Sequence, residues 1–379
     1  MKVLQLQHLN ENWKIHSRST AFANEQCQLV LAFGDCHQIS DPAIYAYLHS
    51  NFPDAHIVLS STSGEILNNE VFDNSVTVTA IQFDNTIVRC AETNIRQHAN
   101  SYEAGKYLMQ QLDQDDLKTV FILSDGTHIN GSELATGLSD HNHRNIPVTG
   151  GLAGDGARFT KTCVGLNRSP EAGNVTAVGL YSHQLKVGHG SFGGWDEFGP
   201  VRTITRSDKN VLYEIDGKCA LDLYKEYLGP YKEELPGSAM FFPLSLKEKD
   251  SEKTLIRTIL NINEKDKSMV FAGNMPVGKQ VRLMKANFDK LIDGSSIAAR
   301  YTFDKLDTQP ELAILISCVG RKLVLQERTD EEVHAANEIF GESTFTTGFY
   351  SYGEISPFHS GSCCELHNQT MTITTFSER

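Results

Sequence analysis

A repeated segment constrains the fold of this chain more than any other feature of its sequence. Residues 41–66 and residues 330–355 each run for 26 residues from an aspartate to a Gly-Glu-Ile end. In both segments a helix-like first half is followed by a second half rich in β-forming residues. A duplicated unit reveals architecture more reliably than local propensity does. We therefore expect two copies of one folding unit.

The similarity continues on both sides of these segments. An apolar stretch precedes each one, at residues 29–36 and 312–318, and an alternating stretch follows each one, at residues 76–79 and 371–374. Alternation of apolar and polar residues is typical of a half-buried strand. A third, looser copy with the order strand, helix, strand, glycine turn and strand occupies residues 119–181. The sequence therefore predicts a pseudo-symmetric molecule.

The aspartates that open the two closest copies are expected to begin helices. Asp41 and Asp330 are residue types that accept a hydrogen bond from a free amide of the first turn. Pro42 follows Asp41, at a position where its missing N–H is harmless. We predict a helix N-cap at each aspartate.

Length and element order together suggest the fold class. The 379 residues exceed what one hydrophobic core usually organises, so two domains are expected. Strands and helices alternate in the repeat, which favours an α/β or mixed α+β fold with helices on mixed sheets. Between the copies, residues 203–229 read as a strand pair with an Asp-Gly turn that leads into a helix, and Gly229-Pro230 ends that helix.

Composition excludes several classes of function. The formal net charge is −13, which would repel a nucleic-acid backbone or an anionic membrane surface. The first 24 residues lack the apolar core of a signal peptide, and no apolar run reaches the ~18 residues of a membrane span. The eight cysteines show no C-x-x-C spacing, which favours reduced thiols in the cytoplasm.

Enzyme motifs are incomplete. Residues 273–280 match a phosphate-binding loop except that Gln280 stands where a Ser or Thr should bind magnesium. No G-x-S-x-G elbow is present. A nucleophilic Cys318 or Cys364 would lack an adjacent pair of base and orienting residue. The protein is therefore expected to be a binder and not an enzyme.

One histidine stands out as a candidate metal or haem ligand. His189 lies between two glycines in a stretch, residues 185–200, that also contains Trp195. Glycines permit close approach of a planar ligand, and aromatic rings can pack against its faces. A histidine satisfied within a glycine-rich connection explains the same pattern. His183 is the alternative ligand.

The neighbouring Cys363 and Cys364 form a second candidate cluster with His359 and His367. Thiolate and imidazole are zinc ligands. Adjacent side chains on an extended chain point to opposite faces, however. We therefore expect one structural thiol and one exposed thiol.

Several stretches in order, beginning at about Cys27, resemble the FIST family of bacterial sensory proteins. They are SDGTHINGSEL (124–134), TGGLAGDGARFTKT (149–162), GGWDEFGPVRTITRS (193–207), NVLYEIDGKCALDLYKEYLG (210–229), ISCVGRK (316–322), GFYSYGEISP (348–357) and ELHNQTMTITTF (365–376). The resemblance implies a tail at residues 1–26, a FIST N domain at residues 27–217 and a FIST C domain at residues 218–379. It also implies small-ligand recognition and signalling to a partner protein.

Stand-alone chains of this size also resemble the NosP-type nitric-oxide sensors. That resemblance implies bound haem b but does not by itself settle which histidine binds the iron. His189 is the expected ligand because of its apolar, glycine-flanked setting, with His183 as the alternative. The partner would be a histidine kinase, diguanylate cyclase or phosphodiesterase that controls two-component signalling and biofilm formation. It also implies a cytoplasmic protein, compatible with a homodimer.

The rival hypothesis is a haem-free sensor of a small metabolite such as an amino acid. Arg321 and Glu354 would hold the charged ends of the ligand, since the Arg fork suits a carboxylate. Tyr350 and Tyr352 would wall the pocket, and Trp195 is a further candidate. The alternative is that Glu354 and its repeat mate Glu65 serve only the fold.

Overall fold

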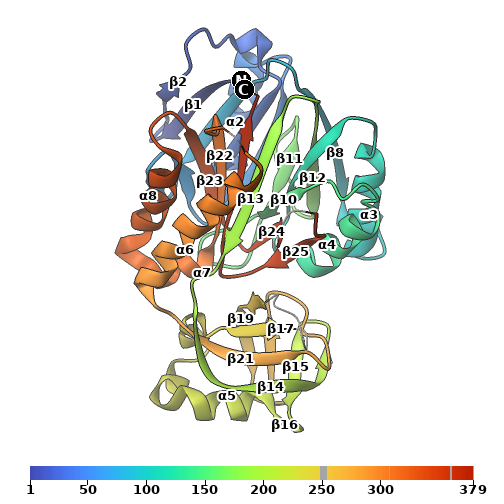
Figure 1. Cartoon of the computed structure of the whole chain (residues 1–379), viewed down its shortest axis with the longest axis vertical. Helices are drawn as coiled ribbons and strands as arrows, with labels where there is room; N and C mark the ends of the chain where they lie inside the picture. The colour runs from blue at the N-terminus through green and yellow to red at the C-terminus, as the bar shows by residue number, and fades with distance from the viewer. Residues whose placement is uncertain (248–253, 307, 359–360, 379) are drawn as a thin grey trace.

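The structure is a computed structural model that describes residues 1–247, 254–306, 308–358 and 361–378. It confirms the mixed α and β fold class. A larger body carries three mixed sheets, and a smaller domain lies below it in Figure 1. No helix among the described residues has the length and apolar character of a membrane span.

Each sheet of the larger body has six strands within the described residues. The first sheet has the order β11 (Val164–Leu166), β4 (His56–Ser61), β3 (Leu29–Gly34), β7 (Val76–Gln82), β1 (Lys2–Leu9) and β2 (Asn12–Arg18). The second has the order β25 (Cys364–His367), β24 (Gly353–Pro357), β10 (Val148–Leu152), β9 (Leu117–Ser124), β12 (Asn174–Tyr181) and β8 (Ile87–Asn94). The third has the order β13 (Lys186–Phe192), β26 (Met371–Ser377), β22 (Leu312–Cys318), β23 (Phe345–Ser351), β5 (Glu65–Leu67) and β6 (Glu70–Phe72).

The three sheets confirm the predicted repeat. The central strands β3, β9 and β22 each pair in parallel with the strand that follows a helical crossover, namely β4, β10 and β23. Each also pairs antiparallel with a returning strand, β7, β12 or β26. Parallel neighbours require a crossover, which explains why helices interrupt each copy. The crossover helices are α1 (Cys36–Ile39), α2 (Pro42–Asn51), α4 (Gly131–Asp140), α7 (Val319–Leu325) and α8 (Thr329–Phe340). The body also holds α3 (Ser101–Leu112) and α6 (Phe288–Tyr301).

The three copies exchange strands in a cycle. Strand β5 of the first copy pairs with β23 of the third. Strand β11 of the second copy pairs with β4 of the first, and β24 of the third pairs with β10 of the second. Each copy thus supplies a strand to its neighbour, so the three sheets form one interlocked body.

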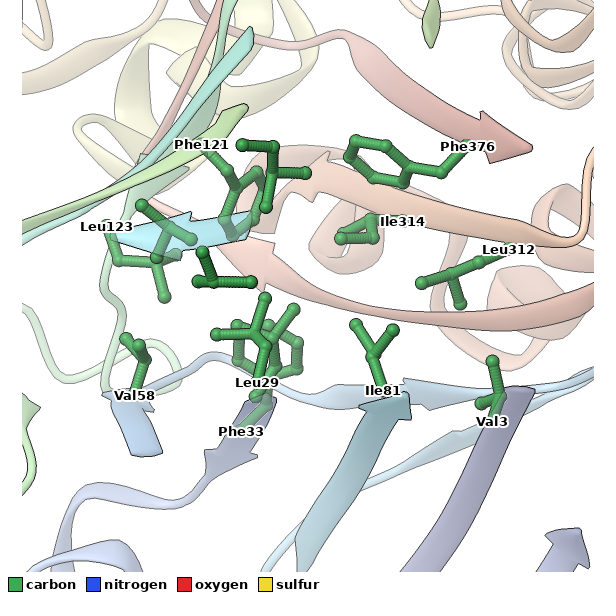
Figure 2. Close-up of a cluster of buried hydrophobic side chains, with 14 of the residues drawn as sticks. Val3, Leu29, Phe33, Val58, Ile81, Phe121, Leu123, Leu312, Ile314 and Phe376 are labelled. Carbon is green, nitrogen blue, oxygen red and sulfur yellow. The ribbon is translucent and has the colours of Figure 1, made fainter. Parts of the chain in front are cut away.

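A shared core fills the space where the sheets face one another, as Figure 2 shows. Phe33 of the first sheet and Phe349 of the third have ring centroids 4.7 Å apart. Burying one such ring stabilises the fold by ~1.5–3 kcal/mol. Core residues labelled in the figure are Val3, Leu29, Phe33, Val58, Ile81, Phe121, Leu123, Leu312, Ile314 and Phe376.

The smaller domain lies between β13 and α6 in the chain and has a core of its own. Its sheet has the order β18 (Thr254–Arg257), β17 (Leu244–Lys247), β21 (Gln280–Lys285), β14 (Asp196–Asp208), β15 (Val211–Ile215), β20 (Ser268–Phe271) and β19 (Ile259–Asn263), and β16 (Lys218–Cys219) pairs with β15. The predicted Asp-Gly turn, Asp216-Gly217, joins β15 to β16 and leads into α5 (Ala220–Leu228). Buried Arg257 ties this domain to the larger body by donating to the Leu366 carbonyl at 2.9 Å.

One of the two predicted helix caps is confirmed. Asp41 caps α2, and its side chain accepts a hydrogen bond from the Ala43 amide. The prediction for Asp330 is wrong, because α8 begins one residue earlier and Asp330 lies in its first turn. Its carboxylate accepts from the Val71 amide at 3.0 Å, so a partner in another copy has replaced the local one.

Candidate functional site

Three cavities of the larger body lie at the carboxyl ends of the parallel strands. Each is bounded by the loop after a central strand of one copy and the loop after the parallel strand of another copy. The first is lined by residues 35–41 and 155–161, the second by residues 319–329 with Ser63, and the third by residues 126–131 with Tyr352. Their volumes are about 590, 400 and 200 Å³. Ligands of mixed sheets commonly bind outside strand carboxyl ends, which makes these cavities the candidate sites.

The largest cavity, which we call the Asp35 cleft, is lined almost entirely by polar and charged side chains. Its lining residues are Asp35, Cys36, His37, Ser40, Asp41, Asp155, Arg158, Thr160 and Lys161. Asp35 and Asp41 come from the starts of α1 and α2, whereas Asp155 and the two cationic side chains come from the loop between β10 and β11. The cleft therefore presents opposite charges from two copies of the repeat.

Asp35 joins the two walls. Its carboxylate caps α1 by accepting from the His37 amide at 2.9 Å. It also forms an ion pair with Arg158 at 2.7 Å. Burial raises the pKa of Asp35, but the hydrogen bonds from Arg158 and the His37 amide outweigh burial and hold the pKa below its usual value. Asp35 is thus a carboxylate at neutral pH.

Asp155 organises the opposite wall. Its buried carboxylate accepts from the amides of Phe159, Thr160 and Lys161 at 2.8, 3.0 and 2.8 Å. The Tyr352 hydroxyl donates to the same carboxylate. These bonds consume the acceptor capacity of Asp155 and shape the loop. They leave the side chains of Arg158 and Lys161 exposed at the cleft.

Phe159 and Tyr352 connect this loop to a neighbouring cavity. Their rings are stacked with centroids 4.6 Å apart. Both line the 200 Å³ cavity, together with Leu260 and Ala272 of the smaller domain. A movement of the loop at residues 155–161 would therefore also change the cavity where the larger body meets the smaller domain.

Two thiols lie beside the cleft. The Sγ atoms of Cys36 and Cys163 are 3.7 Å apart. Cys36 lines the cleft and is 7% exposed, whereas Cys163 is 1% exposed. Their sequence positions are far apart, so no local motif marks the pair.

The structure places two of the predicted ligand residues in a buried network. Arg321 and Glu332 form an ion pair at 2.7 Å, and neither side chain is exposed. The Tyr350 hydroxyl donates to Glu332 at 2.7 Å. Arg321 also donates to the Leu291 carbonyl at 2.7 Å. The network joins α6, α7, α8 and β23, and its members do not line the three cavities described above.

Glu354 and Glu65 occupy matching buried sites. Ser351 donates to Glu354 at 2.8 Å, and Thr62 donates to Glu65 at 2.6 Å, from three residues earlier in each case. Burial raises the pKa of both carboxyl groups to about 8. Their partners lie within the fold, which favours the structural interpretation of the shared Gly-Glu-Ile.

Of the remaining predicted pocket residues, only Tyr352 lines one of the three cavities. Trp195 is 9% exposed, and its Nε1 donates to the Gln369 carbonyl at 2.8 Å. It packs in a small cluster at the join of the larger body and the smaller domain.

His189 is buried and lines none of the three cavities described above. His189 lies on β13 and is 7% exposed. A Cβ added at Gly188 or Gly190 would lie 2.1 Å from the carbonyl oxygen of Thr302 or Ala298. The glycines thus permit close approach of α6 and its C-terminal extension, on the face of β13 opposite to the His189 side chain.

His183 offers no enclosed site either. Its side chain is 81% exposed, and its Nε2 lies 3.1 Å from Asp116. Within the described part of the chain, no three His, Cys, Asp or Glu side chains gather as a metal site. Haem binding stays a prediction, and no step below depends on it.

The expectation for the paired cysteines is met. Cys363 is exposed and Cys364 is buried, with its Sγ 3.2 Å from the Ser139 hydroxyl. His367 is buried, and its Nε2 donates to the Ser356 carbonyl at 2.9 Å. His359 lies outside the described residues.

Asp35, Arg158 and Lys161 were not singled out from the sequence as ligand residues. Arg158 and Lys161 lie in a stretch noted only for its family resemblance. One sequence signal for Asp35 was its position directly after a buried strand. Side chains at such a position lie at the carboxyl edge of the sheet.

Comparisons with known proteins support the resemblance. A FIST N domain matches residues 28–218, and a FIST C domain matches residues 220–357. No curated protein matches the chain. A solved structure of cyanuric acid hydrolase from A. caulinodans is similar at 8% identity and a TM-score of 0.37, covering 95% of this chain and 92% of the hydrolase. Because the two domain matches together span most of the sequence, the chain belongs to the FIST family of signal-transduction sensors.

Proposed function

We propose that the Asp35 cleft is the sensory site, and that it binds a small polar metabolite with both an ammonium and a carboxylate group. A free amino acid is the simplest ligand of this class. The observation that carries the proposal is the division of charge across the cleft, with Asp35 and Asp41 on one wall and Arg158 and Lys161 on the other, while the Asp155 carboxylate is bonded within its own loop.

Lys161 is the group best suited to the ligand carboxylate. Its ammonium forms no ion pair with a carboxylate of the described residues. Lys161 is held beside the cleft by the hydrogen bond that its backbone N–H donates to Asp155. Arg158 already pairs with Asp35. A ligand carboxylate would compete with Asp35 for Arg158 and add a bond to Lys161.

Asp35 and Asp41 supply the complementary anionic wall. One carboxylate oxygen of Asp41 accepts a hydrogen bond from the Ala43 amide at 2.9 Å, and the rest of the side chain is exposed at the cleft. Release of Asp35 from Arg158 would free its carboxylate for a ligand ammonium. The volume of about 590 Å³ falls within the range of small-molecule sites.

The same contacts suggest how binding is transmitted. Drawing Arg158 and Lys161 toward a ligand would shift the loop at residues 155–161. Phe159 in that loop stacks on Tyr352, and both contact the cavity that reaches the smaller domain. The ligand would then favour one arrangement of the smaller domain over another, with a coupling of ~1–3 kcal/mol being typical.

The receiver of the signal is proposed to be a separate histidine kinase, diguanylate cyclase or phosphodiesterase, as the sequence resemblance implies. Membership of the FIST family supports a signalling partner in general. The proposal requires binding alone, with no bond made or broken in the ligand.

Calorimetric titration of the full chain with each of the twenty standard amino acids tests the proposal. At least one is expected to bind. Lys161→Gln and Arg158→Gln should each weaken the affinity for that amino acid by about tenfold or more, because a hydrogen bond to a charged group contributes ~1.5–3 kcal/mol.

Arg168→Gln is the matched control. Arg168 is 52% exposed and pairs with Glu92 at 2.6 Å, much as 54% exposed Arg158 pairs with Asp35 at 2.7 Å. It does not line the cleft, so its variant should bind as the parent does. Absence of binding by all twenty amino acids, or equal loss in the control, would overturn the proposal.

The haem hypothesis makes a different prediction for the same protein. The full chain, expressed with haem supplied, would show an intense Soret band that shifts with nitric oxide. The His189→Ala substitution would abolish the band. That outcome would replace the amino-acid proposal with the gas-sensor one.

A further inference from the structure

We infer that Cys36 and Cys163 form a reactive dithiol that is oxidised to a disulfide by low-molecular-weight disulfides such as oxidised glutathione. The inference concerns the thiols themselves and does not depend on what the Asp35 cleft binds.

The two sulfur atoms are close enough to react with little rearrangement. Their separation of 3.7 Å is a contact distance between thiols, and a disulfide bond is about 2.05 Å long. Cys36 is the first residue of α1, and Cys163 directly precedes β11. The backbone of Cys163 is held by hydrogen bonds to Ser61 at the end of β4, so Cys36, the first residue of a short helix, supplies the movement.

The pair has a clear order of reaction. Cys36 lines the cleft, through which a small disulfide can arrive, whereas Cys163 lies beneath it at 1% exposure. Cys36 is therefore the attacking thiol and Cys163 the resolving thiol. The other buried cysteines, such as Cys27, have no sulfur partner among the described contacts.

The surroundings favour the Cys36 thiolate. The hydrogen bond from Cys163 is the largest influence; with the charge of Lys161 it outweighs burial and lowers the pKa of Cys36 to about 7. The pKa of Cys163 is raised, because it is the proton donor to Cys36 and is itself buried. A thiol with a pKa near ambient pH is the most effective attacking group in exchange reactions.

The reaction balances in two steps. The Cys36 thiolate attacks one sulfur of the small disulfide, forms a mixed disulfide and releases one small thiolate, which takes up a proton. Cys163 then loses its proton and attacks the Cys36 sulfur, which releases the second small thiol. Two electrons pass from the protein dithiol to the small disulfide, and two protons leave with the two small thiols.

The product would join two copies of the repeat. Cys36 belongs to the copy that contains Asp35, and Cys163 belongs to the loop that carries Arg158 and Lys161. A bond across this junction would hold the two walls of the cleft together. The redox state of the pair would thereby set how far the cleft can open.

The test is a titration of the full chain with mixtures of reduced and oxidised glutathione, followed by alkylation of free thiols and peptide mass spectrometry. The parent should yield a linked Cys36–Cys163 peptide that disappears on reduction. Cys163→Ser should stop at the mixed disulfide on Cys36. Cys36→Ser should leave Cys163 unmodified, because that thiol is buried.

Cys363→Ser is the control, since Cys363 is exposed and lies in another part of the chain. It should form the internal disulfide as the parent does. The inference fails if the parent accumulates only glutathionylated Cys363, or if Cys36 stays reduced in Cys163→Ser under the same conditions. Formation of the linked peptide in a chain that binds no amino acid would uphold this inference while the sensory proposal fails.

Discussion

Arg321 and Glu332 form an ion pair in which neither side chain reaches solvent. The guanidinium donates to Glu332 at 2.9 and 2.7 Å through two nitrogens. Tyr350 adds a third bond to the same carboxylate. A residue that the sequence suggested as a ligand group thus holds three helices and a strand together.

Removing the cation of this pair should destabilise the fold strongly. Arg321→Met would leave Glu332 buried and unpaired, at a cost of ~3–5 kcal/mol in the free energy of unfolding. Arg328→Met is the comparison, because Arg328 is 38% exposed and pairs with Glu331 at the surface. Its loss should cost far less, because an exposed ion pair contributes little to stability. Urea denaturation of both variants measures the difference, and equal effects would contradict the prediction.

Stability should fall as the pH rises from about 5 toward 8. Burial raises the pKa of Glu65 and Glu354 to about 8 in the folded chain, from an ordinary value of 4.5. Between these values the folded state binds more protons than the unfolded state, so each group lowers stability by ~1.4 kcal/mol per pH unit. Urea midpoints across this range measure the slope.

Substitution by glutamine tests whether these two carboxyl groups cause the pH dependence of stability. Glu65→Gln and Glu354→Gln should each reduce the fall in stability between pH 5 and pH 8, because an amide does not ionise. Glu331→Gln changes an exposed carboxylate and should leave the slope in place. A parent chain with constant stability between pH 5 and pH 8 would be evidence against raised pKa values at these sites.

The pH dependence of stability below about pH 6.5 should depend on His367. Burial is the main influence that lowers the pKa of His367 to about 4. The unfolded state therefore binds the extra proton between about pH 6.5 and pH 4, so the stability that neutral His367 contributes is lost as the pH falls through this range, while protonation of Glu65 and Glu354 stabilises the fold down to about pH 5. His367→Gln should reduce that loss in a urea titration, whereas His183→Gln at an exposed position should not.

The loop at residues 155–161 should open when its tyrosine anchor is removed. Tyr352→Phe deletes the hydroxyl that donates to Asp155. Trypsin cleavage after Arg158 or Lys161 should become roughly tenfold faster if cleavage follows local opening, because the lost bond involves a carboxylate. Tyr107→Phe, at a 39% exposed side chain on α3, should cleave at the parental rate.

Much of the fold could be predicted from local patterns. The buried strands before the Gly-Glu-Ile segments and the strands after them appear as expected. The alternation after them predicted half-buried strands, however, and β7 and β26 are buried along their whole length because other parts of the molecule cover both faces of their sheets. The Asp41 cap and the Asp216-Gly217 turn are also confirmed. These features depend on residues close in sequence, and such residues carry their own structural preference.

The candidate site could not be predicted in the same way. Arg321 and Glu354 were candidates for a ligand pocket, with a structural role as the alternative for Glu354, and both are buried among partners within the fold. The charged groups of the Asp35 cleft come from two copies of the repeat, and so do Cys36 and Cys163. Their encounter depends on β11 pairing with β4.

Periodicity and turn residues specify where strands and helices begin and which of their faces are apolar. They do not specify which loops become neighbours, because that follows from the cyclic exchange of short strands among three similar sheets. Asp330 illustrates the difference, since its carboxylate bonds the amide of Val71 in place of its own helix. Contacts between distant segments form when interlocked copies pack around a shared core, and their identity is a property of that packing.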